Sequence, residues 1–270
     1  MLSRSHPLAR RLRALRSDAA LRARERVIVA EGVHLASEAL ASRVTIEAAV
    51  VTARLVESGE GRELARKLAD ASVPVYETSP STLDALQDAR TPQPIVMIVR
   101  REAPAIEAAV SGRGGPPLLV IACGVQDPGN LGALLRTADA AGGTGFASTV
   151  GSASLTHPRA VRASMGSLFR LPAAEARLDE ILEEVHRSGL TAMGASARGT
   201  LAYDAADWAG PVALFLGGEG AGLPPEAEAA LAVRVMVPMA PGVESLSVNA
   251  AAAVLLFEAS RKRRALNRAG

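Results

Sequence analysis

The chain has 270 residues, a single cysteine and a formal net charge of +2, and 49% of its residues are hydrophobic. This length favours two domains over one, and no run of about 18 apolar residues is free of charge, glycine or proline, so no membrane span is expected. The basic N-terminus lacks the apolar segment of a secretory signal, and Cys123 cannot form an internal disulfide, so a cytoplasmic location is expected.

Basic residues gather at both ends of the chain. Residues 1–26 hold eight arginines against two acidic residues, and residues 261–264 are all basic. Such clusters suit a phosphate-binding surface, because each neutralised phosphate releases condensed counterions. Solvated helix faces would give the same pattern, so charge alone leaves both interpretations open. Arg10, Arg11 and Arg13 are the candidate RNA ligands of the first cluster.

Residues 1–101 predict a small α/β domain. Apolar runs at 26–30, 45–52, 73–76 and 95–99 are typical of strands, and helical patterns at 32–41, 60–71 and 80–88 alternate with them. Residues 102–117, which end in a stretch rich in Gly and Pro, are expected to form a linker.

Residues 118–270 predict a second α/β domain with a mostly parallel sheet covered on both faces. Strands are expected at 118–123, 144–149, 190–195, 211–216 and 233–237, and helices at 130–141, 158–165, 178–188 and 246–264. Cys123 ends the first of these strands and is expected to be buried there. Three of the strands lead into loops of Gly, Pro and small polar residues, and the ends of buried strands are where open α/β sheets hold ligands.

The first loop contains the turn Asp127-Pro128-Gly129, in which Asp can cap the following helix. An apolar stripe along that helix predicts its buried face, and Arg136 falls off the stripe. On their own, Asn130 is most simply a helix cap and Arg136 a surface charge.

The second loop follows the apolar run 211–216 and places Glu219 among glycines. Glycines let a backbone approach a ligand closely. Glu219 would repel phosphates, and neither a P-loop nor a dinucleotide-binding pattern is present. A cationic or neutral ligand fits better, and S-adenosylmethionine is one such ligand.

The third loop follows the strand at 233–237 and leads through Ser245 into a long Ala-rich helix. Small residues at helical spacing indicate close packing against a sheet or a partner chain. Ser245, Ser247 and Asn249 could simply be capping residues.

In order and spacing, the three segments resemble the motifs of the SpoU-type RNA 2′-O-ribose methyltransferases of the SPOUT class, over residues 118–262. The segment from Arg26 to His34 also resembles the start of that family's N-terminal RNA-binding domain, which is similar to small ribosomal proteins. The resemblance implies a deep trefoil knot in the C-terminal domain, S-adenosylmethionine as cofactor, no metal, and a homodimer.

Carried onto this sequence, the resemblance implies Asn130, Arg136, Glu219 and Ser245 as catalytic residues. The implied cofactor-binding residues are Gly217, Gly218, Gly220, Val237, Met239, Leu246 and Ser247. The family commonly has Asn where this chain has Ser247, with Asn249 two residues further on, so either Ser247 keeps the role or another group supplies it. Arg162 matches a basic position of the family and is a further candidate RNA ligand, and an arginine on a helix surface would fit the sequence equally well.

These residues suit methyl transfer to a ribose 2′-hydroxyl, which is chiefly a positioning task. A guanidinium is a poor base, so Arg136 is expected to clamp phosphate and to stabilise the developing alkoxide. Asn130 and Ser245 would orient the ribose, and Glu219 could hold Arg136 or Asn130 in place.

Ribosomal RNA is favoured over transfer RNA, because a ribosomal-protein-like domain recognises RNA shape. Three alternatives stay open: a non-catalytic RNA-binding or ribosome-assembly protein that retains the fold, a transfer RNA ribose methyltransferase, and an enzyme that methylates a base.

Overall fold

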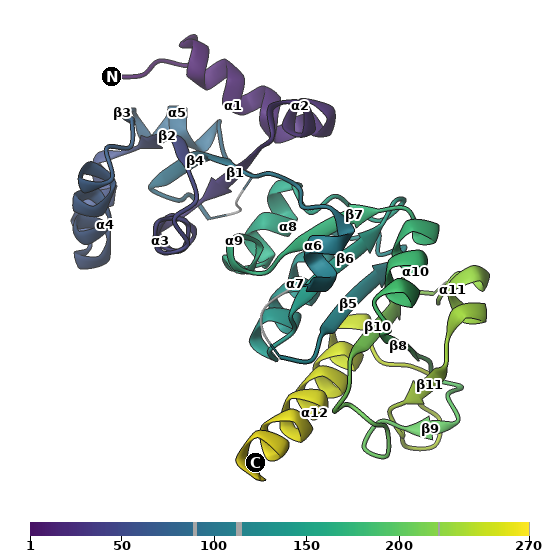
Figure 1. Ribbon diagram of the computed structural model, residues 1–270. Coiled ribbons are helices and arrows are strands. Elements are labelled where there is room, and N and C mark those ends of the chain that lie inside the picture. The colour runs from purple at the N-terminus through teal and green to yellow at the C-terminus, as the bar shows by residue number, and fades with distance from the viewer. Residues whose placement is uncertain (89–90, 112–114, 221, 270) are drawn as a thin grey trace. The chain divides into compact units, whose positions relative to one another are not determined.

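A computed structural model describes residues 1–88, 91–111, 115–220 and 222–269 and divides the chain into two compact units (Figure 1). The first unit comprises Met1–Glu102 together with Ser154–Phe169, and the second comprises Ala103–Ala153 and Arg170–Gly270. Within the expected linker, Ile106–Ser111 forms helix α6, whose apolar residues join the core of the second unit, and residues 112–114 lie outside the described residues.

The first unit is built on a four-stranded sheet in the order β1-β4-β2-β3. Strand β4 is antiparallel to β1 and β2, and β3 runs parallel to β2 at one edge. Its elements along the chain are α1 (Pro7–Ser17), α2 (Ala19–Glu25), β1 (Val27–Glu31), α3 (Val33–Ala41), β2 (Ile46–Val51), the 3₁₀ helix η1 (Ala53–Glu57), α4 (Gly59–Asp70), β3 (Val75–Glu77), α5 (Pro80–Asp84) and β4 (Ile95–Arg100).

The helices α1 and α2 were not among the expected elements. Ala9, Leu12 and Leu15 of α1 are buried in one core with Val29 and Ile98 of the sheet. His6 caps α1 by accepting from the Leu8 backbone N–H, and Asp18 caps α2 by accepting from that of Leu21. The arginine-rich N-terminus is therefore a structural part of the first unit and not a charged tail.

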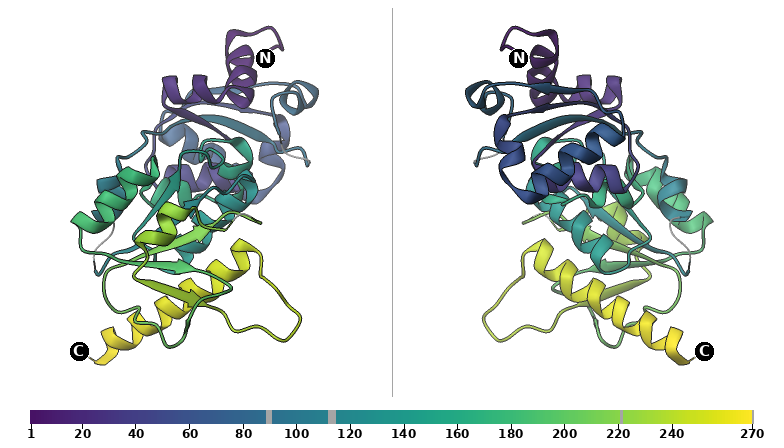
Figure 2. Two further views of the ribbon diagram at one scale, coloured as in Figure 1. Left: turned by 90° about the vertical axis from the view of Figure 1, so that its right-hand side faces the viewer. Right: turned by 90° about the vertical axis from the view of Figure 1, so that its left-hand side faces the viewer.

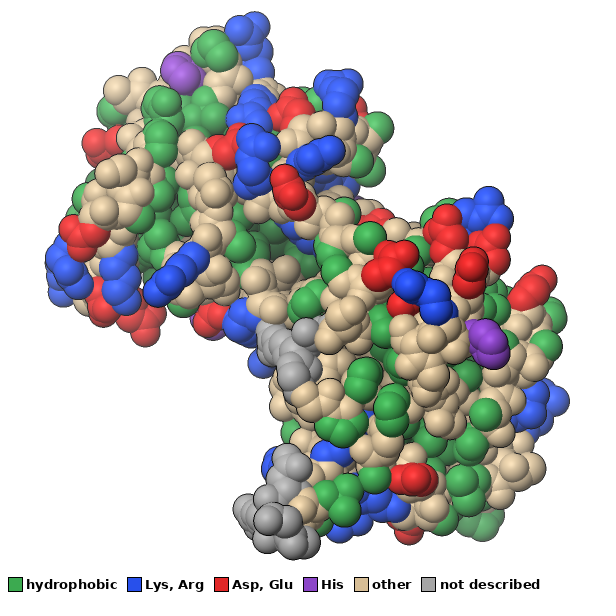
Figure 3. Space-filling view, viewed as in Figure 1, with side chains coloured by type: hydrophobic (Ala, Val, Ile, Leu, Met, Phe, Trp, Pro, Cys, Tyr) green, Lys and Arg blue, Asp and Glu red, His purple; other side chains and the backbone are tan. Residues whose placement is uncertain are grey.

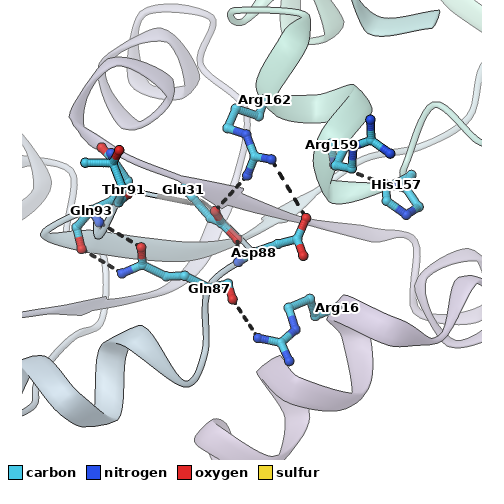
Figure 4. Close-up of polar contacts among 9 residues, drawn as sticks. All are labelled: Arg16, Glu31, Gln87, Asp88, Thr91, Gln93, His157, Arg159 and Arg162. Carbon is cyan, nitrogen blue, oxygen red and sulfur yellow. Dashed lines mark hydrogen bonds and ion pairs between the residues drawn. The ribbon is translucent and has the colours of Figure 1, made fainter. Parts of the chain in front are cut away.

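The segment Ser154–Phe169 packs with the first unit through helix α8 (Pro158–Ala163), which lies against β1. Arg162 of this helix forms ion pairs with the buried Glu31, at 3.2 Å, and with Asp88, at 3.8 Å (Figure 4). Glu31 also accepts a hydrogen bond from the Asp88 backbone N–H at 2.7 Å. The charge of Arg162 is thus balanced inside this unit.

His157 begins α8 as its N-cap, and its Nδ1 accepts from the Arg159 backbone N–H at 3.1 Å. Burial and the neighbouring Arg22 hold the pKa of His157 below its usual value of 6.5, against the opposing effect of Asp88. The pKa of His157 is lower in the folded chain than in the unfolded chain. As the pH falls through about 6.5, the unfolded chain therefore binds more protons than the folded chain does.

We therefore expect His157 to contribute to stability above about pH 6.5 and to lose that contribution at lower pH. Urea unfolding between about pH 7.5 and 5 should show a steeper fall of the midpoint for the native chain than for His157→Asn, which keeps a capping acceptor but does not titrate. Parallel curves for the two proteins would contradict this assignment.

The second unit is built on a seven-stranded sheet in the order β7-β6-β5-β10-β8-β11-β9, in which every pairing is parallel. Its elements are α6 (Ile106–Ser111), β5 (Leu118–Cys123), α7 (Pro128–Ala140), β6 (Gly145–Thr149), β7 (Ala173–Ala176), α10 (Leu178–Arg187), β8 (Thr191–Ala195), β9 (Leu201–Ala202), β10 (Val212–Gly217), α11 (Pro225–Ala230), β11 (Val233–Met236) and α12 (Val248–Ala269), and helix α9 (Ser167–Arg170) spans the change from one unit to the other. The predicted α/β fold with a parallel sheet is confirmed.

Helices cover both faces of this sheet. Helices α6, α10 and α11 share one core with alternate residues of β5 and β10, such as Ile121 and Phe215. Helix α7 contacts β5 and β6, and α12 contacts α7 and β10. Strand β5 is buried along its whole length, as its uninterrupted apolar sequence predicts for a central parallel strand. No helix among the described residues is long and apolar enough to cross a membrane.

The basic cluster near the C-terminus is used mainly inside the fold. Lys262 donates to the carbonyl oxygens of Asp204 and Ala206, and the half-buried Arg263 donates to those of Trp208, Gly210 and Pro117. Arg261 pairs with Glu258 on the same helix. These bonds anchor α12 to the loops beside it, so Lys262 and Arg263 are not free phosphate ligands.

Candidate functional site

The three loops singled out in the sequence follow β5, β10 and β11 at the carboxyl edge of the parallel sheet. Strands β5 and β10 are neighbours, and their last residues, Cys123 and Gly217, stand opposite each other. Strand β11 lies two strands from β10, with β8 between them. Figure 2 shows residues 237–247 as a long loop that extends from the sheet before α12 begins. The carboxyl ends of these strands therefore gather the three loops at one edge of the second unit.

Gly218 brings the first and second loops into backbone contact, and Gly217 lets the second loop fold back closely on itself. A Cβ on Gly218 would lie 2.3 Å from the carbonyl oxygen of Gly124, and one on Gly217 would lie 2.3 Å from the carbonyl carbon of Gly222. The loop after β10 is also closed by a hydrogen bond from the Gly222 N–H to the Gly218 oxygen at 3.2 Å. A side chain at Gly218 would force the two loops apart, and one at Gly217 would open the second loop.

Asn130 and Glu219 meet across these loops. Asp127 caps α7 by accepting from the Asn130 backbone N–H at 3.0 Å, so Asn130 is not the cap and its side chain is available for another role. Its Nδ2 donates to Oε1 of Glu219 at 2.7 Å. Of the two partners considered for Glu219, the structure pairs it with Asn130.

Asn249 joins this pair from the first turn of α12, and it was not predicted as a site residue. Its Nδ2 donates to Oδ1 of Asn130 at 3.0 Å. Ser247, by contrast, accepts from the Ala250 backbone N–H at 3.3 Å, as a capping residue does. The sequence signal for Asn249 was a polar side chain in the third segment, but a capping role explained that side chain equally well.

Arg136 lies on the outward face of α7, as its place off the apolar stripe predicts. In the described part of the chain its guanidinium forms no hydrogen bond or ion pair, so it is not held by Glu219. A guanidinium on the exposed face of α7 is available for an anionic ligand.

The loop before α12 leaves much of its backbone free. Ser245, Leu246 and Ser247 are exposed, and Val237 and Met239 are half-buried. Between residues 237 and 246, in the part of the chain that is described, the backbone forms one hydrogen bond, from Val243 to Ala240. Free N–H and C=O groups beside apolar side chains suit a flat, neutral ring with polar edges.

Cys123 closes β5 next to the first loop but is not a reactive group. Burial raises the pKa of its thiol to about 12, so the thiolate needed for nucleophilic attack is scarce at neutral pH. It serves as a small apolar residue of the core.

The four candidate RNA ligands differ in how free they are. Arg10 is exposed and without a hydrogen bond or ion pair among the described residues, whereas Arg11 pairs with Glu25 and Glu47, each at 2.8 Å. Arg13 donates to the carbonyl oxygen of Arg4, and Arg162 is paired as described above. Figure 3 shows Lys and Arg side chains gathered over the part of the first unit that holds α1 and α2, with acidic side chains between them.

Two family models match the chain. The model of the SpoU rRNA Methylase family matches residues 117–257, and that of the MRM3-like substrate binding domain matches residues 7–97. The first match spans the parallel sheet and all three loops. The second spans most of the four-stranded sheet.

Individual relatives agree with these matches. A protein of Synechocystis sp. described as an uncharacterized tRNA/rRNA methyltransferase is 31% identical over 272 residues, which cover 99% of this chain and 96% of the relative. The 23S rRNA (guanosine-2′-O-)-methyltransferase RlmB of Ralstonia nicotianae is 35% identical over 58% of this chain and 64% of its own length. The crystal structure of an AdoMet-bound rRNA methyltransferase from Sinorhizobium meliloti superposes with a TM-score of 0.84 at 28% identity, covering 97% of each chain.

Proposed function

This chain belongs to the SpoU rRNA methylase family, as the three loops predicted, and we propose that it transfers a methyl group from S-adenosylmethionine to a ribose 2′-hydroxyl of ribosomal RNA. Membership of the family makes it an RNA methyltransferase. The observation that carries the finer proposal is the contact of Asn130 with Glu219 and Asn249, which joins all three motif segments at one edge of the sheet. The Ralstonia relative, named for guanosine 2′-O-methylation of 23S rRNA, supports the ribose as acceptor.

The residues at this edge fit S-adenosylmethionine. The unpaired backbone groups of residues 237–246 could hold an adenine ring between Val237, Met239 and Leu246. Gly217 and Gly218 keep the neighbouring loop narrow, and Gly220 adopts the left-handed backbone of its turn, with φ of 81°. Glu219 favours a cationic ligand over a phosphate. When bound, the cofactor supplies an electrophilic methyl group on a sulfonium.

The side chains divide the remaining work between position and charge. Asn130 would orient the ribose hydroxyl, together with Ser245 from the third loop. Arg136 would bind the neighbouring phosphate and stabilise the negative charge that develops on the 2′-oxygen. Glu219 holds Asn130 and has no separate role toward RNA in this proposal.

RNA binding is assigned to the first unit, which the substrate-binding model matches. Arg10 and Arg13 are the primary phosphate ligands proposed there. Arg11 and Arg162 would have to exchange their carboxylate partners for phosphate, which makes them secondary candidates.

A homodimer through α12 is also proposed. Ala250, Val254 and Phe257 lie three or four residues apart on one side of this helix, and Phe257 is 48% exposed. An exposed aromatic in such a stripe suits a second copy of the chain. The trefoil knot implied by the family stays a prediction.

The test is methylation in vitro with tritiated S-adenosylmethionine, using total ribosomal RNA and transfer RNA from cells that lack the gene. Nuclease digestion followed by mass spectrometry should find a 2′-O-methylated nucleoside in ribosomal RNA. A methylated base, or methylation of transfer RNA alone, would refute the assignment. Absence of any heat on titration with S-adenosylmethionine would instead favour a non-catalytic RNA-binding protein.

A further inference from the structure

The hydrogen bonds among Glu219, Asn130 and Asn249 have one possible direction. The Glu219 carboxylate accepts from the Asn130 NH₂ group, which leaves the Asn130 carbonyl oxygen facing Asn249. Asn249 must then present its own NH₂ group to that carbonyl. The carboxylate therefore fixes the orientation of both amides, and Asn249 is the donor that holds Asn130 from the opposite side.

Stability alone does not account for an amide at position 249. The Oδ1 atom of Asn249 is buried and has no hydrogen-bond partner among the described residues. A buried acceptor without a donor destabilises a folded protein, and an alanine would remove that acceptor at the cost of one hydrogen bond. The bond that Asn249 does form reaches Asn130, 119 residues away, at the carboxyl edge of the sheet.

The neighbouring sequence points the same way. Ser247 accepts from the Ala250 backbone N–H at 3.3 Å, and within the described residues its side chain has no hydrogen bond to Asn130. Asn249, two residues later, contacts the first motif instead. Within the third segment, the amide that reaches Asn130 therefore comes from position 249 and not from position 247.

We propose that Asn249 is a positioning residue of the methyl-transfer site, which acts by holding the Asn130 amide in the orientation set by Glu219. The inference rests on the proposed function, because Asn130 is the residue assigned to orient the ribose. Without the donor from Asn249, the Asn130 amide could rotate and lose the geometry that the transfer step requires.

The decisive comparison is between Asn249→Ala and Asn249→Asp. Aspartate has the shape of asparagine but cannot donate, so it would oppose the Asn130 carbonyl with a second acceptor and draw the NH₂ group away from Glu219. We expect kcat to fall about tenfold or more in Asn249→Ala and further in Asn249→Asp, while KM for S-adenosylmethionine stays within about threefold. A role in filling space would give the reverse order, because aspartate fills the space better than alanine.

The assay uses the full-length chain with total ribosomal RNA from cells that lack the gene. Melting curves accompany the kinetics, and the melting temperature of Asn249→Ala should lie within about 3 °C of the native value. Thr137→Ala is the matched control, since it removes one side-chain hydrogen bond from α7, to the Ala133 carbonyl, without contacting Asn130. Its kcat should be unchanged.

The outcomes separate the two proposals. If the native chain methylates ribosomal RNA and Asn249→Asp is as active as Asn249→Ala or more active, the positioning role is refuted and the proposed function stands. If both variants keep the native kcat, the role is likewise refuted. If the native chain transfers no methyl group to ribosomal RNA, the proposed function fails and this inference fails with it.

Discussion

Replacement of Arg136 by alanine is expected to lower methyl transfer to ribosomal RNA about 1000-fold, with S-adenosylmethionine affinity within a few-fold of the native value. The reason is the position of this side chain: it is exposed on α7, close along the chain to Asn130, and no described carboxylate neutralises it. A guanidinium there can bind a phosphate through two parallel hydrogen bonds and stabilise negative charge on the attacking oxygen. Arg136 does not line the proposed cofactor pocket. Its loss should therefore lower the rate of methyl transfer without lowering the affinity for S-adenosylmethionine.

Single-turnover kinetics and calorimetric titration measure the two quantities. Arg136→Lys is the graded control, because it keeps the charge but loses the planar fork, and it should retain part of the rate. A near-native rate in Arg136→Ala would remove this residue from the mechanism. A parallel loss of cofactor binding would show that Arg136 supports the fold of the loop instead.

Gly218→Ala should damage both stability and cofactor binding. The added Cβ would lie 2.3 Å from the carbonyl oxygen of Gly124, a backbone atom that cannot move aside without opening the contact between the β5 and β10 loops. We expect the free energy of unfolding to fall by about 3 kcal/mol and S-adenosylmethionine affinity to fall at least about tenfold.

Gly210→Ala is the matched control, since no atom lies within 4 Å of the Cβ it would add and its backbone is not left-handed. Urea unfolding should place this control within about 0.5 kcal/mol of the native chain. If Gly218→Ala is as stable as the control, the two loops do not meet as described.

The sequence predicted the parallel sheet of the second unit because its central strands are unmistakable. Residues 118–123 and 212–216 are uninterrupted apolar runs, and both are fully buried between two layers of helices. The short elements β7, β9 and α11 were missed, since runs of two to six residues without periodicity carry little signal.

Charge was harder to interpret than hydrophobicity. Arg11 and Arg162 looked like candidate phosphate ligands, but Glu47 and Glu31 neutralise them from elements 36 and 131 residues away in the chain. The apolar spacing of α1 was likewise obscured by its arginines. Pairing of this kind depends on the tertiary fold, so a single sequence does not contain it in readable form.

In the candidate site, too, motif residues were predictable from the sequence, whereas a contact that depends on the tertiary fold was not. Asn130 and Glu219 were predicted from their motifs, and in the structure Nδ2 of Asn130 lies 2.7 Å from Oε1 of Glu219. The sequence leaves Asn249 open, because a capping role satisfies the local sequence rules as well as a role in the site does. Its contact with Asn130 requires that the start of α12 return to the start of α7, which no local pattern indicates.

The most direct test of the proposed function is a map of ribose 2′-O-methylation across the ribosomal RNA of cells that carry the gene, lack it, or carry only Arg136→Ala. We expect at least one methylated ribose to disappear on deletion, to return with the native gene, and to stay absent with the variant. Identical ribose-methylation maps in all three strains would contradict the proposal that this protein methylates ribosomal RNA.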